Sequence, residues 1–265
     1  MPKVSVVCPT IRKDGLDVVR KALQKQTFKD FEWLIGSRFN PEIPEATWIP
    51  DNFEQGYWSL NRIYNSLFQH SSGDIIVTWQ DWIYANPDAL EKFVENVGKT
   101  NAVVSGVGDQ YERVNKWGKP EVKIWSDPRK TTDYGSFYEC NWNDAEWNFC
   151  AFPKEAIFSV GGMDEELDFL GYGGDQLQVS ERMEQLGTLF FLDQTNLSYT
   201  VRHDRSNFEG QENWDKNHVL FARGKSGDTL YDERKRELVI SGRWPVLPYL
   251  SRGDDYDQQD VPIES

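Results

Sequence analysis

The sequence predicts an α/β fold in which helices cover a mixed, mostly parallel β-sheet. Two observations along the first 108 residues carry this prediction. Short β-branched runs alternate with segments whose apolar residues recur at helical spacing. The first run, residues 3–8, also passes directly into Pro9 and Thr10, as a buried strand does when it enters a loop. Alternation of strand and helix at this spacing is typical of a parallel sheet with crossover helices.

The individual elements follow from the same periodicities. The expected strands are residues 3–8, 31–35, 75–79, 103–107 and 188–192. The expected helices are residues 16–26, 57–70, 87–97, 154–160, 177–186 and 211–223. Gly36 is expected to break the second strand, and residues 41–56 are expected to form a loop. The aromatic and polar segment 109–148 reads either as an insert that contains strands or as a long substrate loop.

Composition excludes some classes of function. A formal net charge of −14 disfavours a broad grip on nucleic acid or on an anionic membrane, which needs clustered Lys and Arg. The three cysteines have no metal-site spacing and suggest a reducing compartment. We find neither a signal peptide nor an apolar run of about 18 residues, the length that a membrane span needs. We therefore expect a soluble, cytoplasmic protein without a transmembrane segment.

The most informative motif is a pair of double glycines, each leading into an acidic residue. Gly161 and Gly162 precede Asp164, and Gly173 and Gly174 precede Asp175. Glycines allow positive φ and close approach of a ligand to the backbone, so an acid after them is expected to be fixed and exposed. The same pattern also forms ordinary turns and helix caps.

Three segments in order resemble an inverting family 2 glycosyltransferase of the GT-A fold. Residues 4–10 (VSVVCPT), with 26–33 (QTFKDFEW), resemble the opening strand, the Pro-Thr loop and the passage into the second strand. Residues 61–82 resemble the passage that ends in the D-x-D motif. The glycine motif resembles the family's G-G-x-D-E and G-G-E-D segments, with Arg182 and Gly187 in register.

The resemblance implies a nucleotide-diphosphate sugar donor, a hydroxyl acceptor and a divalent cation, Mn²⁺ or Mg²⁺. It implies three parts: a nucleotide-sugar-binding half at 1–108, an acceptor-binding half at 109–205 and a polar C-terminal extension at 206–265. The implied donor-binding residues are Pro9, Thr10, Arg38, Asn61, Gln80 and Asp81. The implied substrate-binding residues are Trp82, Asp164, Gly173, Gly174 and Gln176. Asp81 and His203 are the implied metal ligands, and Asp175 is the implied catalytic base.

The sequence departs from the family pattern at three places. The position after the second strand, where an acid often holds the base, carries Arg38. The D-x-D positions are Gln80, Asp81 and Trp82, so that only the middle residue is acidic. The expected base position is Gln176, which cannot accept a proton at neutral pH, so the base would be Asp175.

These departures leave alternatives open. The first is a metal-independent site in which Arg38 or Arg202 offsets the phosphate charge. The second is a phage-type glycosyltransferase that modifies hydroxymethylated bases of DNA, which the net charge disfavours. The third is a non-catalytic module that binds a nucleotide-sugar or a glycan on a GT-A-like scaffold.

Overall fold

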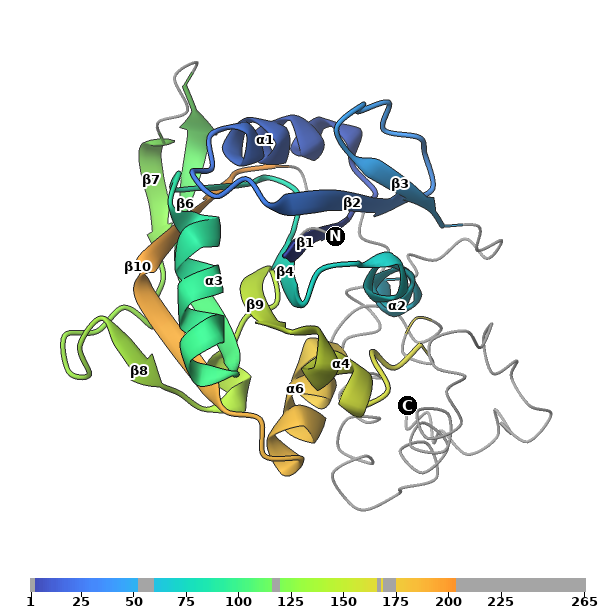
Figure 1. Ribbon diagram of the computed structural model, residues 1–265. Coiled ribbons are helices and arrows are strands. Elements are labelled where there is room, and N and C mark those ends of the chain that lie inside the picture. Colours follow the sequence, from blue (N-terminus) through green and yellow to red (C-terminus); the bar gives the residue numbers. More distant parts are fainter. Residues whose placement is uncertain (1–2, 52–59, 116–119, 166–167, 169–174, 204–265) are drawn as a thin grey trace, which may run out of the picture.

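The computed structural model describes residues 3–51, 60–115, 120–165, 168 and 175–203. One ten-stranded mixed sheet forms the centre of the molecule, with helices on both faces (Figure 1). The predicted α/β class is therefore confirmed. The expected helix at 211–223 lies outside the described residues. Among the described residues, no helix is both long and apolar enough to cross a lipid bilayer.

The bounds of the elements are as follows. The strands are β1 (Val4–Pro9), β2 (Phe31–Ser37), β3 (Thr47–Pro50), β4 (Ile75–Trp79), β5 (Ile83–Ala85), β6 (Val103–Val114), β7 (Pro120–Ser126), β8 (Phe137–Glu139), β9 (Phe149–Pro153) and β10 (Phe190–Val201). The helices are α1 (Lys13–Gln24), α2 (Leu60–His70), α3 (Ala89–Thr100), α4 (Lys154–Ser159), α6 (Asp175–Gln185) and the 3₁₀ turn η1 (Trp142–Asp144).

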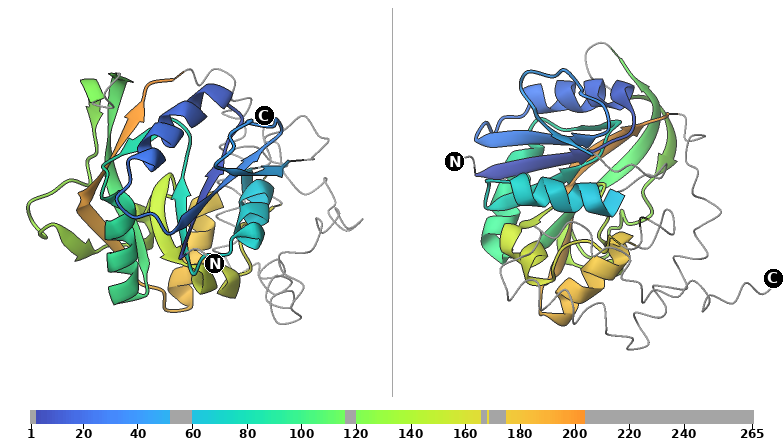
Figure 2. Two further views of the ribbon diagram at one scale, coloured as in Figure 1. Left: turned by 45° about the horizontal axis from the view of Figure 1, so that its top comes forward. Right: turned by 90° about the vertical axis from the view of Figure 1, so that its right-hand side faces the viewer.

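The sheet has a parallel half and a mixed half. Strands β3, β2, β1 and β4 lie side by side and are all parallel. Strand β9 then enters antiparallel between β4 and β6. Strand β10 runs parallel to β6 and carries the short antiparallel strands β5 and β8. Strand β7 folds back on β6 as an antiparallel hairpin. As a result β1, β2, β4, β6 and β10 all point their carboxyl ends the same way (Figure 2).

Two apolar cores hold the helices against the sheet. On one face, Leu16 and Val19 of α1 and Phe93 of α3 pack with the side chains of β1 and β4 that point to that face. On the other face, α2, α4 and α6 pack on the opposite side chains of the same strands, with Met183 of α6 fully buried. Alternate residues of β1 enter alternate cores, because side chains of a strand point to opposite faces.

The structure corrects several boundaries. Gly36 does not end the second strand, since β2 continues to Ser37. A Cβ added at Gly36 would lie 2.3 Å from Cγ1 of Ile63, so a glycine there allows α2 to pack closely on the sheet. The expected loop at 41–56 contains β3, and β10 is far longer than the expected strand at 188–192. The segment 109–148 carries strands, as the insert interpretation expected.

Candidate active site at the carboxyl edge of the sheet

The polar residues of the predicted donor site follow the carboxyl ends of neighbouring strands. Thr10 follows β1 and donates its backbone N–H to the carbonyl of Gly36 in β2, at 2.9 Å. Gln80 and Asp81 directly follow β4, the neighbour of β1 on the other side. In a parallel sheet this edge is where ligands usually bind.

Thr10 and Asp81 meet there, and a third residue joins them. The Thr10 hydroxyl donates a hydrogen bond of 2.6 Å to Oδ2 of Asp81. Arg12 binds the same carboxylate at two points, with Nε 2.9 Å from Oδ2 and Nη2 2.7 Å from Oδ1. The Asp81 side chain is 3% exposed and that of Arg12 is 23% exposed. Sequence reasoning did not include Arg12, although a basic residue between the first strand end and the first helix was a visible signal.

Helix α1 begins directly against this pair. Arg12 is the residue before the first turn of α1, and a Cβ added at Gly15 would lie 2.8 Å from Cβ of Asp81 and 2.6 Å from Cδ1 of Trp82. Only a residue without a side chain permits this approach. The N-terminal end of α1, which carries partial positive charge, is thereby placed beside the carboxylate.

Trp82 adopts a backbone conformation that is rare for a residue with a side chain. Its φ is 62°, and the backbone is held on both sides, by Gly15 as acceptor and by Val201 as donor. The indole ring stacks on the ring of His203, with 5.3 Å between centroids and 15° between planes. Backbone strain of this kind costs about 1–3 kcal/mol and clusters at functional sites. Trp82, which follows Asp81 in the sequence, is therefore in stacking contact with His203, the predicted metal ligand.

The other D-x-D position, Gln80, is held from two sides. Its backbone N–H donates to the carbonyl of Asn148 at 3.0 Å, which extends the pairing of β4 with β9. Its side-chain amide donates to the hydroxyl of Tyr64 on α2, at 3.3 Å. Gln80 therefore links the carboxyl edge of the sheet to the segment just before β9.

Two further predicted cations lie at the periphery of this edge. Arg38, after β2, is exposed and has its Nε 3.4 Å from Oδ2 of the buried Asp51. Arg202, after β10, is exposed and its guanidinium lies 3.2 Å from a carboxylate oxygen of Glu112. Among the described residues, the cation that contacts Asp81 is Arg12, at a position that the sequence interpretation did not weigh.

Asn61, predicted to bind the donor, is buried against a different partner. Its backbone N–H and side-chain amide both donate to Oδ1 of Asp168, at 2.8 and 2.9 Å, and Arg62 N–H donates to Oδ2. These donors belong to the first turn of α2, so Asp168 acts as a helix cap from 107 residues away. Burial raises the pKa of Asp168, against the lowering effect of these donors.

The glycine motif divides into structural and candidate catalytic parts. Gly161 and Gly162, with φ of 77° and 78°, terminate α4 by donating to carbonyls of that helix. Arg182 of α6 donates to the carbonyl of Gly162 at 2.6 Å, which ties the motif to α6. Asp164 is 5% exposed, so the expectation of an exposed carboxylate at this position is wrong.

The second half of the motif lies partly outside the described residues. Gly173 and Gly174 are not described, and Asp175 is the first residue of α6. Gln176 follows in the first turn and is partly buried. The helix itself is positioned by the indole of Trp147, which donates to the hydroxyl of Ser180 at 2.8 Å.

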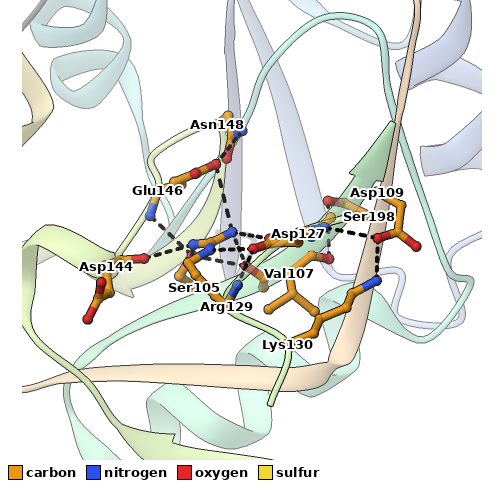
Figure 3. A network of polar contacts seen from close by, with 12 residues as sticks. Ser105, Val107, Asp109, Asp127, Arg129, Lys130, Asp144, Glu146, Asn148 and Ser198 are labelled. Atoms are coloured by element: carbon orange, nitrogen blue, oxygen red, sulfur yellow. Dashed lines mark hydrogen bonds and ion pairs between the residues drawn. The ribbon is translucent and has the colours of Figure 1, made fainter. Parts of the chain in front are cut away.

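A network of charged groups lies between β6 and the segment just before β9 (Figure 3). Arg129 binds both oxygens of Asp127, at 2.9 and 2.5 Å, and donates to the carbonyl of Asp144 at 2.7 Å. Burial opposes the charge of Asp127, yet the hydrogen bonds from Arg129 hold its pKa below the usual value. The carboxylate of Glu146 lies 3.7 Å from Arg129 and accepts a 3.0 Å hydrogen bond from Asn148.

Glu146 is the acid that sequence reasoning missed on this side of the site. Its side chain is 44% exposed, whereas that of Asp127 is 1% exposed. Glu146 is bonded to the side chain of Asn148, and the backbone carbonyl of Asn148 accepts the N–H of Gln80. Asn148 precedes β9, which runs antiparallel to β4. Sequence periodicity therefore could not predict where Glu146 lies relative to Asp81.

The residues at this edge do not form a ready site for a divalent cation. Both oxygens of Asp81 already bind a guanidinium, and the flanking Gln80 and Trp82 carry no charge. The His203 Nδ1 lies 2.9 Å from the carbonyl of Val201. Within the described part of the chain, no three His, Cys, Asp or Glu residues are grouped so that they could hold a metal ion.

Comparison with known proteins shows the fold. No protein-family model matches the sequence, and no curated protein matches it. The structure is similar to TarS 1–349 of S. aureus, with a TM-score of 0.61 at 11% identity over 91% of this chain and 70% of that chain. It is similar to GalNAc-T7 in a structure with UDP, GalNAc and Mn²⁺, with a TM-score of 0.63 at 13% identity over 91% of this chain and 55% of that chain. A structure of TarS 1–349 with UDP gives a TM-score of 0.59 at 12% identity, over 91% of this chain and 70% of that chain. TarS and GalNAc-T7 are both GT-A-type glycosyltransferases, so the predicted GT-A fold is confirmed.

Proposed function

We propose that this protein transfers a sugar from a nucleotide-diphosphate sugar to an acceptor hydroxyl, with inversion at the anomeric carbon. The observation that carries the proposal is the meeting of Thr10, Arg12 and Asp81 at the carboxyl edge of parallel strands. This is where an α/β sheet binds nucleotides. The GT-A fold and the glycosyltransferase neighbours support the same class of reaction.

The donor is proposed to lie across the ends of β1, β2 and β4. Pro9 and Thr10 would contact the nucleoside, and Arg38 and the Gln80 amide would lie at the periphery of the donor. The similar structures of GalNAc-T7 and TarS 1–349 were solved with UDP, which makes UDP-sugars the first donors to test. The Trp82 indole, stacked on His203, offers an aromatic face of the kind that packs on sugar rings.

The acceptor side is proposed to lie toward β9 and the start of α6. Asp175 is our proposed general base, because it begins α6 and negative charge is favoured near the N-terminus of a helix. The Glu146 side chain is 44% exposed and accepts a hydrogen bond from Asn148, whose carbonyl accepts the Gln80 N–H, and we propose it as a second candidate for the same role. Gln176 would then donate or accept a hydrogen bond to a sugar or acceptor hydroxyl.

The reaction proposed for these groups is a single displacement. The carboxylate base takes the proton of the acceptor hydroxyl, and the oxygen forms a bond to the anomeric carbon on the face opposite the diphosphate. The bond from the anomeric carbon to the diphosphate oxygen breaks, and the electron pair leaves with the nucleoside diphosphate. Cationic groups beside that oxygen stabilise the charge that develops on it.

A transfer assay tests the proposal. Purified protein is incubated with a panel of UDP-, GDP- and dTDP-sugars together with pooled hydroxyl acceptors: simple glycans, small alcohols and DNA that contains hydroxymethylated bases. We expect release of nucleoside diphosphate with one donor, and an anomeric configuration opposite to that of the donor by NMR of the product. Retained configuration would contradict inversion. Donor binding without turnover by any acceptor would favour a binding module on this fold.

A further inference from the structure

We propose that Arg12, and no divalent cation, is the cationic group at the donor diphosphate, so that donor binding is independent of metal. The inference rests on the proposed function, because it concerns the donor of that reaction. It reverses the expectation that Asp81 and His203 share a cation. It also assigns the cationic contact with the diphosphate to a residue other than Arg38 or Arg202.

The first support is the state of the Asp81 carboxylate. Oδ2 accepts the Thr10 hydroxyl at 2.6 Å and Nε of Arg12 at 2.9 Å, and Oδ1 accepts Nη2 of Arg12 at 2.7 Å. The carboxylate is therefore bound along both oxygens by a permanent cation. A dication at the same oxygens would have to displace a two-point, charge-assisted pair in a nearly buried place.

The second support is the chemistry of the positions beside Asp81. Hard divalent cations take oxygen ligands, preferably carboxylates. Gln80 has its amide directed at Tyr64, and Trp82 has no oxygen in its side chain. The ring of His203 lies flat on Trp82, which is a packing arrangement. Within the described residues Asp81 is the only acid that the D-x-D segment contributes.

The third support is the placement of Arg12. It immediately precedes α1, whose N-terminal end packs on Asp81 and Trp82 through Gly15. The helix terminus attracts anions, and the guanidinium stands at the same end. A guanidinium carries five N–H donors, of which Arg12 directs one on Nε and one on Nη2 at Asp81. Arg12 is more exposed than Asp81, 23% against 3%, and so covers the carboxylate on the solvent side.

The chain offers a matched control for Arg12. Arg20, two turns further along α1, binds Glu45 with the same two-point geometry, at 2.5 and 3.0 Å. That pair is exposed, with side chains 39% and 40% accessible. Removal of Arg20 therefore deletes an equal charge from the same helix without touching the candidate site.

The test is calorimetric titration of the wild type with UDP, GDP and dTDP, first in EDTA and then with Mn²⁺. We expect one of them to bind with dissociation constants that agree within about threefold in the two buffers, since a threefold change is under 1 kcal/mol. Arg12→Ala should weaken binding in EDTA by about tenfold or more, the loss of one charge-assisted contact. Arg20→Ala should bind as the wild type does. Arg12→Lys keeps the charge without the two-point bond, so it should fall between them and serves if Arg12→Ala does not fold.

The outcomes separate this inference from the proposed function. Binding that requires Mn²⁺, or uptake of Mn²⁺ that Asp81→Asn abolishes in the paramagnetic resonance spectrum, would overturn the inference while leaving nucleotide binding in place. Equal affinity of Arg12→Ala and the wild type in EDTA would also overturn it. Binding of no nucleoside diphosphate in either buffer would refute the proposed function, and the inference with it.

Discussion

Arg129 and Arg12 each hold a nearly buried aspartate at two points, and they do so in opposite ways. Arg129 and Asp127 are two residues apart, and Arg129 also reaches the carbonyl of Asp144 (Figure 3). Arg12 and Asp81 are 69 residues apart and join the ends of two strands. The Arg129 side chain is 15% exposed and that of Arg12 is 23% exposed. One pair closes a loop on itself, whereas the other brings distant segments together at the edge where ligands bind.

The difference separates a structural pair from a candidate functional pair. The Arg129 network secures the segment between β7 and β9 to β6, with Ser105 and Gly108 among its partners. The acceptors of Arg129, which include the Asp127 carboxylate and the Asp144 carbonyl, belong to β6 and to the segment between β7 and β9. The Arg12 pair is surrounded by Thr10, a strained Trp82 and the start of α1, which are features of a binding site. The same ion-pair chemistry therefore serves two purposes, and mutation should separate them.

The largest expected effect on stability comes from Arg129. Arg129→Ala leaves Asp127 buried and unpaired, which should lower the free energy of unfolding by about 3–5 kcal/mol. Arg12→Ala should cost less stability, because its pair lies nearer solvent. Urea denaturation measures both, with Arg113→Ala as the control at an exposed pair. A greater loss for Arg12→Ala than for Arg129→Ala would invert the comparison.

The next effect concerns catalysis on the acceptor side. Asp175→Asn should reduce transfer on the order of a hundredfold or more, as expected for a lost general base, while donor affinity stays the same. Glu146→Gln keeps the shape of the second candidate and should change the rate little. Single-turnover rates with saturating donor measure this. A large loss in Glu146→Gln with full activity in Asp175→Asn would assign the base to Glu146.

A third effect is the acid sensitivity of the Arg129 network. The pKa of Asp127 is lowered in the folded protein, so its ionised form adds stability above the unfolded pKa of about 3.9. That contribution is lost as the pH falls through the lower folded value. Asp127→Asn should thus be destabilised relative to wild type at pH 7, with the difference shrinking below about pH 4. A difference that is constant across this range would show that the charge of Asp127 is not the cause.

The smallest effect is expected at His203. His203→Ala removes the ring stacked on Trp82 and should cost about 0.5–1.5 kcal/mol of stability, the usual value of an aromatic pair. Donor affinity in EDTA should change little. Thermal unfolding and calorimetry measure these two quantities. If Mn²⁺ strengthens donor binding in the wild type and not in His203→Ala, His203 is a metal ligand after all.

Sequence pattern predicted β1, β2 and β4 of the parallel half, because each is a short run rich in apolar residues. It missed β3 and β5, which have four and three residues and too few positions to show a period. It also missed β9, the five-residue strand between β4 and β6. It placed Thr10 and Asp81 at one edge, since strand ends in a parallel sheet meet. The contact of Arg12 with Asp81 and the cap that Asp168 gives α2 depend on side chains brought together from distant segments. No local pattern records such pairs.

The most direct test of the account is a crystal structure with the nucleoside diphosphate that binds in calorimetry. The account predicts that the diphosphate lies at the carboxyl edge of β1 and β4, within hydrogen-bond distance of Arg12. It also predicts that the nucleoside lies beside Thr10. A nucleotide bound elsewhere, with Arg12 and Asp81 unchanged and out of contact, would contradict the assignment of this edge as the donor site.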